Sequence, residues 1–390
     1  MSALKVINIT EEGRFGGPQK RITEVAEGLK TYDIETVVIC PKENAERFQG
    51  LLKAQGIKFY ALSLHRLTKN PTELFKFIFY FFFELFAIIK VIRKEKPNLV
   101  HCNGAWQIKG VIAAKLTGTR CVWHMNDTHF TGLVMALYKV TAKLFGDFFL
   151  GASERALHYY QPNIKATDKN IIQAPIRTVD FNPAITAASP TIDRKGSINI
   201  LTVGHLNTIK GYDTLIPAIG ILNQLTDKKV NFYVVGKMLD NLKEFTQNLL
   251  DEQKTLGIKN LHFLGERRDV KELLAASDIY VCPSDYEASP ISVWEALAMA
   301  KPTVSTDVGD VAEIFAQHHC GLVVPTKNPE ALAKAILILV DDAAQRKTLG
   351  ENARRTAIDF FDIEVCVRKH AQLYQDLAGI TIKNGTGVSI

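Results

Sequence analysis

The sequence predicts an α/β fold in which two Rossmann-like, doubly wound domains face each other across a central cleft. Three observations lead to this prediction. The chain has 390 residues, more than one ordinary α/β domain needs. Short apolar runs alternate with longer helical patterns from end to end, which is typical of parallel sheets covered on both faces. The alternation breaks once near the middle of the chain and then restarts.

The predicted elements of the first half begin directly after the N-terminus. The strands are Val6–Thr10, Thr36–Cys40, Lys58–Leu62, Leu99–Cys102, Cys121–His124, Phe148–Gly151 and Ile171–Ala174. The helices that lie between them include Gln19–Lys30, Ile108–Leu116 and Leu133–Leu144. Continuous apolar strands of this length indicate burial on both faces of a parallel sheet.

The same alternation of predicted strands and helices returns in the second half of the chain. Its predicted strands are Ile198–Val203, Asn231–Val235, Leu261–Phe263, Ile279–Cys282, Thr303–Ser305 and Gly321–Val324. Its helices include Tyr212–Leu225, Leu239–Leu256, Val270–Ala276 and Ile291–Ala300. Ligands of open α/β sheets bind beyond the carboxyl ends of the strands, so functional motifs are expected just after strands.

The domain boundaries follow from the break in this pattern. Residues 1–182 are expected to form the first domain and residues 198–360 the second. The stretch 183–197 contains proline, small residues and a charged end, and it reads as an interdomain linker. The helix predicted at 361–377 is expected to pack back on the first domain, and 378–390 to be a loose tail.

Composition excludes several classes of protein. A hydrophobic content of 47% with 23% charged residues indicates an ordered globular chain. The excess of 47 basic over 41 acidic residues, +6, is too small for a nucleic-acid binder but suits anionic substrates or an anionic membrane surface. The cysteines form no C-x-x-C pair and the N-terminus lacks a signal-peptide pattern, so a reducing, cytoplasmic location is expected. The cysteines are Cys40, Cys102, Cys121, Cys282, Cys320 and Cys366.

The most informative motif is CPSDYEASPISVWEALAMAKP at 282–302. A predicted strand ends here, and a helix is expected to start near Ser289 and Pro290, because serine caps helices and proline suits the first turn. The free amides and dipole of that helix start would favour a diphosphate. Glu287 and Glu295, separated by seven residues, could each accept hydrogen bonds from a hydroxyl pair, one on a sugar and one on a ribose. An isolated glutamate pair is usually only solvated, but this strand–turn–helix context favours a site.

This motif resembles the E-x(7)-E signature of the retaining GT-B glycosyltransferases of family 4. Pro283, Ser284, Ala296, Ala298 and Pro302 are in register with it, together with the two glutamates. Ala288 and Lys301 replace the usual glycines. The resemblance implies that Glu287 contacts the donor sugar and that Glu295 contacts the ribose of the nucleotide.

A second loop, Val203–Gly211, follows the first strand of the second domain. Lys210 could neutralise phosphate oxygens as a mobile point charge. In the similar family this loop reads G-R-x-x-x-x-K-G, so Lys210 matches the lysine and His205 replaces the arginine. An imidazole loses the bidentate fork of arginine and makes the charge depend on pH.

In the first domain, the resemblance points to Gly16 and Gly17 and to His124. The two glycines open a predicted helix, but they lack the G-x-G-x-x-G spacing of a dinucleotide-binding fingerprint. The resemblance instead implies that they lie under the donor phosphate, where glycines let the backbone approach a ligand. His124 ends a predicted strand, where similar enzymes place a histidine near the donor sugar. A lone histidine of this kind is often structural, and the strand-end position favours function.

These motifs give one set of candidate residues and one expected activity. The expected catalytic residues are Glu287, Lys210 and His124. The expected donor-binding residues are Gly16, Gly17, His205, Lys210, Gly236, Glu287, Pro290, Ile291, Ser292 and Glu295. The expected reaction is retaining transfer of a glycosyl group from a nucleoside diphosphate sugar, with UDP-sugars the commonest in similar enzymes, to a glycan or lipid-linked acceptor in bacterial surface polysaccharide synthesis. No cofactor and no metal is expected, since no D-x-D or His/Asp cluster occurs. An epimerase or phosphorylase of the same fold, and a non-catalytic nucleotide-binding membrane scaffold, remain as alternatives.

The run LFKFIFYFFFELFAIIKVIR at 74–93 is unusually aromatic. Its length approaches the ~20 residues of a membrane span, but Lys76, Glu84 and Lys90 interrupt it. Inserting each such charge into the centre of a bilayer would cost roughly 2.5–3.5 kcal/mol, so a membrane span is not expected. Two interpretations stand: a long core helix, or a helix that docks on a bilayer. Basic residues up to Lys96 would favour anionic headgroups, so peripheral attachment to the inner face of the cell membrane through 74–96 is a further hypothesis.

Overall fold

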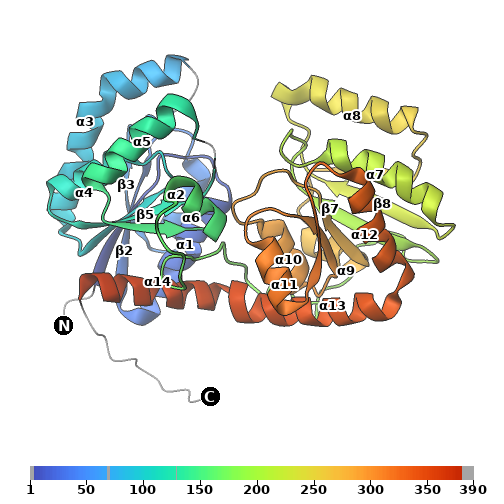
Figure 1. The fold of residues 1–390 in the computed structure, drawn as a ribbon. Helices are drawn as coiled ribbons and strands as arrows, with labels where there is room; N and C mark the ends of the chain where they lie inside the picture. The colour runs from blue at the N-terminus through green and yellow to red at the C-terminus, as the bar shows by residue number, and fades with distance from the viewer. Residues whose placement is uncertain (1–3, 68–70, 129, 380–390) are drawn as a thin grey trace. The chain divides into compact units, whose positions relative to one another are not determined.

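The computed structural model describes residues 4–67, 71–128 and 130–379, and its chain divides into two compact units. The first unit combines residues 1–174 with 363–390, and the second comprises 175–362. Each contains one six-stranded parallel sheet with helices on both faces, which confirms the prediction of two Rossmann-like domains (Figure 1).

The first unit has the strand order β3-β2-β1-β4-β5-β6. Its strands are β1 (Leu4–Ile9), β2 (Ile34–Pro41), β3 (Lys58–Leu62), β4 (Leu99–Asn103), β5 (Arg120–Met125) and β6 (Phe148–Gly151). Its helices are α1 (Gly17–Leu29), the 3-10 turn η1 (Lys30–Tyr32), α2 (Glu46–Ala54), α3 (Pro71–Glu95), α4 (Ile108–Leu116), α5 (Gly132–Phe145), α6 (Glu154–Tyr160) and α14 (Ile363–Ala378). Helices α3, α4 and α5 cover one face of the sheet, and α1, α2 and α14 pack on the other.

The second unit repeats this topology. Its sheet order, β12-β11-β10-β7-β8-β9, is the order of the first unit read from the other edge. Its strands are β7 (Ile198–Val203), β8 (Val230–Val235), β9 (Leu261–Gly265), β10 (Ile279–Cys282), β11 (Thr303–Thr306) and β12 (Gly321–Val324). Its helices are α7 (Tyr212–Leu225), the 3-10 turn η2 (Asp240–Leu242), α8 (Lys243–Thr255), α9 (Val270–Ala276), α10 (Ile291–Ala298), α11 (Val311–His318), α12 (Pro329–Asp341), α13 (Ala343–Thr356) and the π-helical turn η3 (Ala357–Phe361).

Two predictions about the middle of the chain need correction. The expected strand Ile171–Ala174 is reduced to an isolated bridge between Ile171 and Gly151. The stretch 183–197, expected as a linker, belongs to the second unit: Ser189 bonds to the backbone of Glu272, and Ile192 is buried in the core. The chain instead divides between residues 174 and 175, because polar composition alone does not reveal such local anchoring.

The C-terminal segment returns to the first unit. Helix α14 packs on α1, where Val367 lies against Gly28 so closely that a β-carbon there would meet it at 2.5 Å. The tail expected at 378–390 falls outside the described residues from 380 onward. All six cysteines are buried free thiols.

The aromatic helix α3 has two different faces. Its inner face, which includes Phe77, Leu85 and Ile88, is part of the core formed with α4 and the sheet. Its outer face leaves large side chains in solvent, and Phe83 is 71% exposed. Glu84, one of the charges that interrupts the run, is buried and forms an ion pair with Lys109 of α4. No helix among the described residues is long and apolar enough to cross a membrane.

Candidate functional site

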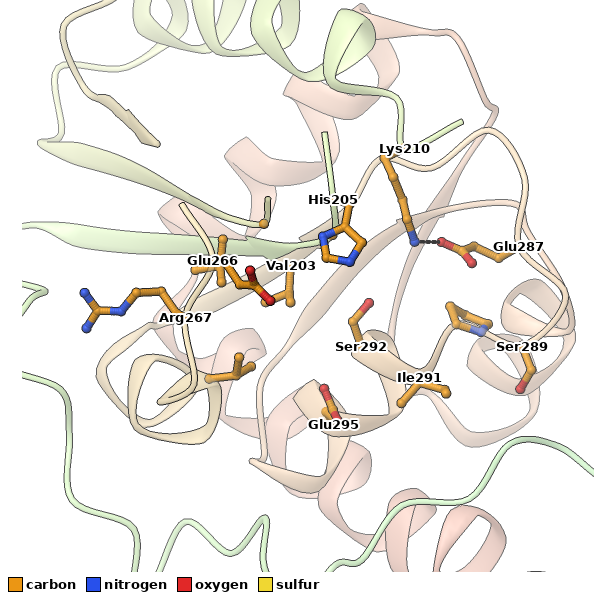
Figure 2. Close-up of a pocket in the computed structure, with 15 residues that line it drawn as sticks. Val203, His205, Lys210, Glu266, Arg267, Glu287, Ser289, Ile291, Ser292 and Glu295 are labelled. Carbon is orange, nitrogen blue, oxygen red and sulfur yellow. Dashed lines mark hydrogen bonds and ion pairs between the residues drawn. The ribbon is translucent and has the colours of Figure 1, made fainter. Parts of the chain in front are cut away.

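A cavity of about 400 Å³ lies at the carboxyl ends of β7, β8 and β10 in the second unit. It is lined by the loop that follows each of these strands and by the start of α10 (Figure 2). All predicted donor-binding residues of this unit line the cavity: His205, Lys210, Gly236, Glu287, Pro290, Ile291, Ser292 and Glu295. The sequence motifs, which are separated by up to ninety residues, therefore meet in one place.

Two glycines allow the strand-end loops to approach each other. A β-carbon at Gly236 would lie 1.8 Å from the carbonyl oxygen of Gly204, and one at Gly211 would lie 1.8 Å from that of Pro283. Gly211 also has a φ of +65°, which side chains rarely adopt. The Asp285 amide donates to the carbonyl of Ile209 at 2.8 Å, which ties the loop after β7 to the loop after β10.

This tie brings Lys210 and Glu287 together. The Nζ of Lys210 lies 2.5 Å from Oε1 of Glu287, as the dashed line in Figure 2 shows. The same oxygen accepts a hydrogen bond from the hydroxyl of Ser284 at 3.0 Å. Burial alone would lower the pKa of Lys210, but attraction to Glu287 outweighs it and raises that pKa, so the lysine stays charged. The side chains keep 22% and 16% exposure, so both are held in place yet reachable by a ligand.

His205 is oriented by the neighbouring loop. The backbone N–H of Lys237 donates to Nδ1 of His205 at 3.2 Å. Since Nδ1 accepts, the proton of the neutral ring lies on Nε2. The imidazole that replaces the usual arginine can therefore donate a hydrogen bond to a phosphate oxygen without being charged.

Helix α10 begins at Ile291, where the sequence predicts it, but its N-cap is Pro290 and not Ser289. No side chain caps the first turn. Ser289, the predicted cap, instead accepts a hydrogen bond from the indole N–H of Trp294 at 3.0 Å. The helix start lines the cavity, so uncapped backbone amides and the positive end of the helix dipole are available for an anion. Glu295 lies one turn further along, at the far side of the cavity from Glu287 (Figure 2).

The cavity also contains residues that the sequence reasoning did not select. Glu266 and Arg267 come directly after β9 and add one charge of each sign, while Val270 adds an apolar contact. Arg267 is already held by Asp269 through two hydrogen bonds of 2.8 and 2.7 Å. Glu266 and Arg267 could have been selected from the sequence only by their position immediately after a predicted strand. A short polar turn has no distinctive residue spacing that would mark it as part of a site.

The other predicted donor-binding residues, Gly16 and Gly17, lie in the first unit. Gly17 opens α1, Gly16 is its N-cap, and no side chain caps this helix either. The amide of Gln19 donates to the backbone of Glu12 at 2.8 Å, which fixes the loop in front of the helix. The local geometry expected of an anion-binding turn is present, and contact with a donor stays a prediction.

His124, the third predicted catalytic residue, is fully buried in the first unit. Arg21 lies 3.1 Å from its Nε2, and His101 lies 3.1 Å from its Nδ1. Nδ1 of His101 in turn lies 2.7 Å from the hydroxyl of Tyr374 on α14. Both ring nitrogens of His124 are therefore engaged by protein groups.

The direction of this hydrogen-bond chain is set by Arg21, because a guanidinium can only donate. Burial, reinforced by the charge of Arg21, holds the pKa of His124 well below its usual value, so the ring is neutral. His124 must then accept a hydrogen bond at Nε2 and donate one from Nδ1 to Nε2 of His101. His101 in turn donates from its own Nδ1 to the hydroxyl of Tyr374. In this arrangement His124 is a structural link between β5, α1 and α14, and the predicted contact with a sugar stays a prediction.

The paired sheets and the glutamate–lysine cavity define the class of the protein: it is a glycosyltransferase with the GT-B fold. Two family models match the chain, "Glycosyl transferases group 1" over residues 189–356 and "Glycosyltransferase Family 4" over residues 15–169. The chain belongs to the group 1 glycosyltransferases, and it is an enzyme of that family.

Two relatives support this assignment along most of the chain. The N,N'-diacetylbacillosaminyl-diphospho-undecaprenol alpha-1,3-N-acetylgalactosaminyltransferase of Campylobacter jejuni is 33% identical over 376 residues, which cover 90% of this chain and 93% of the relative. The UDP-Gal:alpha-D-GlcNAc-diphosphoundecaprenol alpha-1,3-galactosyltransferase of Escherichia coli is 25% identical, with 75% and 79% covered. The structure of Anabaena HepE in complex with UDP superposes with a TM-score of 0.79 at 19% identity, covering 96% and 100%, and shows the shared fold.

Proposed function

We propose that this enzyme transfers a sugar from a UDP-sugar, with retention of anomeric configuration, to a hydroxyl of a polyprenyl-diphosphate-linked saccharide. The observation that carries the proposal is the second-unit cavity, where Lys210, His205 and the start of α10 surround space for a diphosphate. Two relatives named for acceptors of the diphospho-undecaprenol class, one of them also named for UDP-Gal, support this choice of donor and acceptor. We further propose a place for this reaction in bacterial surface polysaccharide synthesis at the cytoplasmic side of the membrane.

The difficult step in this reaction is the departure of the diphosphate with its negative charge. The bond between the anomeric carbon and the phosphate oxygen breaks, and a bond from the acceptor oxygen to the same carbon forms on the same face. The proton of the acceptor hydroxyl passes to the departing diphosphate. Lys210, the Nε2 proton of His205 and the α10 amides stabilise the leaving group, so the proposal requires no metal cofactor.

The two glutamates of the motif have separate tasks in the proposal. Both hydrogen bonds to Glu287 from described residues use Oε1, which leaves Oε2 to accept from a hydroxyl of the donor sugar. Glu295, on the far side of the cavity, accepts from the ribose. Gly236 lines the cavity and lets the loop after β8 lie directly against Gly204, which places His205 beside the donor.

The outer face of α3 gives this enzyme access to a lipid-linked acceptor. Its exposed side chains are Phe75, Ile78, Phe79, Tyr80, Phe82, Phe83 and Phe86. We call these seven residues the aromatic face. Basic residues at the end of the helix, among them Lys90, Arg93 and Lys94, are exposed beside it. An apolar face bordered by cations is typical of a helix that lies in the interface of an anionic bilayer.

The test is whether UDP is released only when an acceptor is present. The full chain is incubated with UDP-N-acetylgalactosamine, UDP-galactose or UDP-glucose, with and without α-D-GlcNAc-diphosphoundecaprenol in detergent micelles. Acceptor-dependent UDP release with a lengthened, α-linked product is expected for one donor. Conversion of the donor sugar without acceptor would support an epimerase, and UDP binding without any turnover would support a scaffold. Either outcome contradicts the proposal.

A further inference from the structure

A short loop joins Glu287 to the start of α10 and forms one wall of the second-unit cavity. Ser289 and Pro290 of this loop line the cavity, and Ser289 lies on the same side of it as Glu287 (Figure 2). The loop places two groups at once, because the glutamate precedes it and the first amides of α10 follow it. A shift of well under 1 Å in this backbone would misplace both groups, so the side chains that hold the loop matter for the reaction.

Trp294, in the first turn of α10, holds this loop from inside the unit. The side chain is fully buried, and its indole N–H donates to Oγ of Ser289 at 3.0 Å. A buried indole usually satisfies its single donor with a partner of this kind. The bond links the loop back to the helix that follows it, so the two form one local unit.

The face of the indole ring packs on Phe361. The two rings are stacked, with their centroids 3.9 Å apart and 12° between their planes. Phe361 ends the π-helical turn η3, and its carbonyl accepts a hydrogen bond from the amide of Ile176 at 2.8 Å. The next residue, Asp362, accepts one from the amide of Thr178 at 3.0 Å. A π-helical turn is a rare element that recurs at functional sites, and here it provides an anchored support for Trp294.

The loop is also confined from the side of β11. Gly309, which follows this strand, has a φ of +55°. A β-carbon there would lie 2.8 Å from the carbonyl oxygen of Ala288 and 3.5 Å from Cδ of Pro290. The two backbones are therefore in contact, and together with the hydrogen bond from Trp294 this contact restricts the loop on two sides.

We infer that Trp294 is a positioning residue for the donor: it holds Ser289, and through Ser289 the loop that carries Glu287 and opens α10. Because Trp294 is fully buried, it acts on the donor only through this loop. The inference rests on the proposed function, which assigns the diphosphate and the sugar of the donor to this cavity. It adds to that function the side chain that keeps the binding groups in register.

The experiment deletes each partner of the hydrogen bond separately. Trp294→Phe keeps an aromatic ring against Phe361 and removes the N–H donor, whereas Ser289→Ala removes the acceptor at a partly exposed position where misfolding is not expected. The double variant removes both. UDP release gives the kcat, the KM for the UDP-sugar that the wild type uses, and the KM for α-D-GlcNAc-diphosphoundecaprenol. Melting temperatures identify any variant that does not fold.

Two control variants make the same chemical changes at residues that do not line the cavity. Trp123→Phe removes a buried indole N–H that donates to the carbonyl of Gly104 at 2.9 Å. Ser277→Ala removes a buried hydroxyl that donates to the carbonyl of Leu274 at 3.0 Å. Both controls should lower the melting temperature and leave the KM for the donor unchanged.

Each single variant of the pair should raise the KM for the UDP-sugar about tenfold, the equivalent of one hydrogen bond, and leave the KM for the lipid-linked acceptor unchanged. The double variant should be no more impaired than Trp294→Phe alone, because both changes act through one bond. A merely structural role would lower the amount of active enzyme, and hence the apparent kcat, without changing the KM for the donor.

The inference is overturned if a folded Ser289→Ala enzyme keeps the wild-type KM for the donor, if the two single effects add in the double variant, or if Trp123→Phe raises that KM equally. Calorimetric titration of the wild type with UDP separates this from failure of the proposed function. A wild type that does not bind UDP contradicts the proposed function. A wild type that binds UDP, together with an unaffected Ser289→Ala enzyme, contradicts only the role of Trp294.

Discussion

The two units share one topology, and each has a cavity of about 400 Å³ at a corresponding place, beyond the carboxyl end of the first strand of its sheet. In the second unit the loop after β7 supplies Lys210, and the uncapped start of α10 adds donors. In the first unit the loop after β1 supplies Glu11, whose buried carboxyl lies 3.2 Å from Nζ of Lys109. The same fold therefore presents available hydrogen-bond donors in one cavity and a buried ion pair beside the other.

This difference shows how one topology can carry different side chains at the same place. A cavity with available donors suits a phosphate, because its oxygens only accept hydrogen bonds. Topology fixes where each cavity forms, and the residues of the loop after the first strand decide which charges lie beside it.

The largest effect is expected from removing the lysine of the second cavity. Lys210→Ala should lower kcat by about 10²–10³, or about 3–4 kcal/mol, because it deletes a group that stabilises the leaving diphosphate. Lys254→Ala, on the exposed side of α8, is the matched control. Steady-state UDP release measures both. Near-normal turnover in a folded Lys210→Ala enzyme would show that this lysine does not stabilise the leaving diphosphate. The second-unit cavity would then no longer differ from the first by a working phosphate-binding cation.

The next largest effect concerns the buried carboxyl of Glu11 beside the first-unit cavity. The folded-state pKa of Glu11, about 7, lies above its ordinary value of 4.5. The stability that this group contributes is therefore full below pH 4.5 and is lost as the pH rises through 7. The unfolding free energy of the wild type relative to Glu11→Gln should fall by about 3 kcal/mol between pH 4.5 and pH 8.

Urea unfolding at several pH values, followed by fluorescence, measures this difference. Trp106 and Trp123 report on the first unit, and Trp294 reports on the second. A difference that does not change with pH would show that Glu11 titrates normally, and it would weaken the contrast between the cavities.

A smaller effect is expected at the membrane. Replacing Phe83 with serine should weaken binding to phosphatidylglycerol liposomes about tenfold or more, since burial of one phenylalanine is worth about 1.5–3 kcal/mol. Leu225→Ser, at an exposed apolar residue of the second unit, is the control. Flotation at low salt measures binding. If the Phe83→Ser variant floats with liposomes as the wild type does, α3 is not the docking element.

The smallest effect sharpens the description of the donor cavity. His205→Arg should tighten UDP binding several-fold at pH 8, by about 1 kcal/mol, because a charged hydrogen bond replaces a neutral one. Calorimetric titration with UDP measures the change. Unaltered affinity would mean that this side chain does not face the diphosphate.

Much of this structure could be predicted from the sequence, for identifiable reasons. Continuous apolar strands and the E-x(7)-E spacing are local patterns, so the two sheets and the positions of Glu287, Glu295 and Lys210 were predicted correctly as one cavity. The predicted capping role of Ser289 was wrong, because its hydroxyl instead accepts a hydrogen bond from the indole N–H of Trp294. Residue spacing does not reveal such a contact.

The first-unit cavity was missed for a related reason. Glu11, Arg66 and Lys76 are spread over three segments, and each alone resembles an ordinary surface charge. The burial of Glu11 depends on Lys109, nearly a hundred residues later in the chain. The same holds for His124, whose engagement by Arg21 and His101 is a tertiary feature.

The outward-facing phenylalanines of α3 also have a practical consequence for anyone handling the protein. In plain aqueous buffer, chains would shield these rings by associating with one another. Oligomers that disappear when mild detergent is added would then reflect contact between these exposed rings, and their stoichiometry would carry no information about the working enzyme.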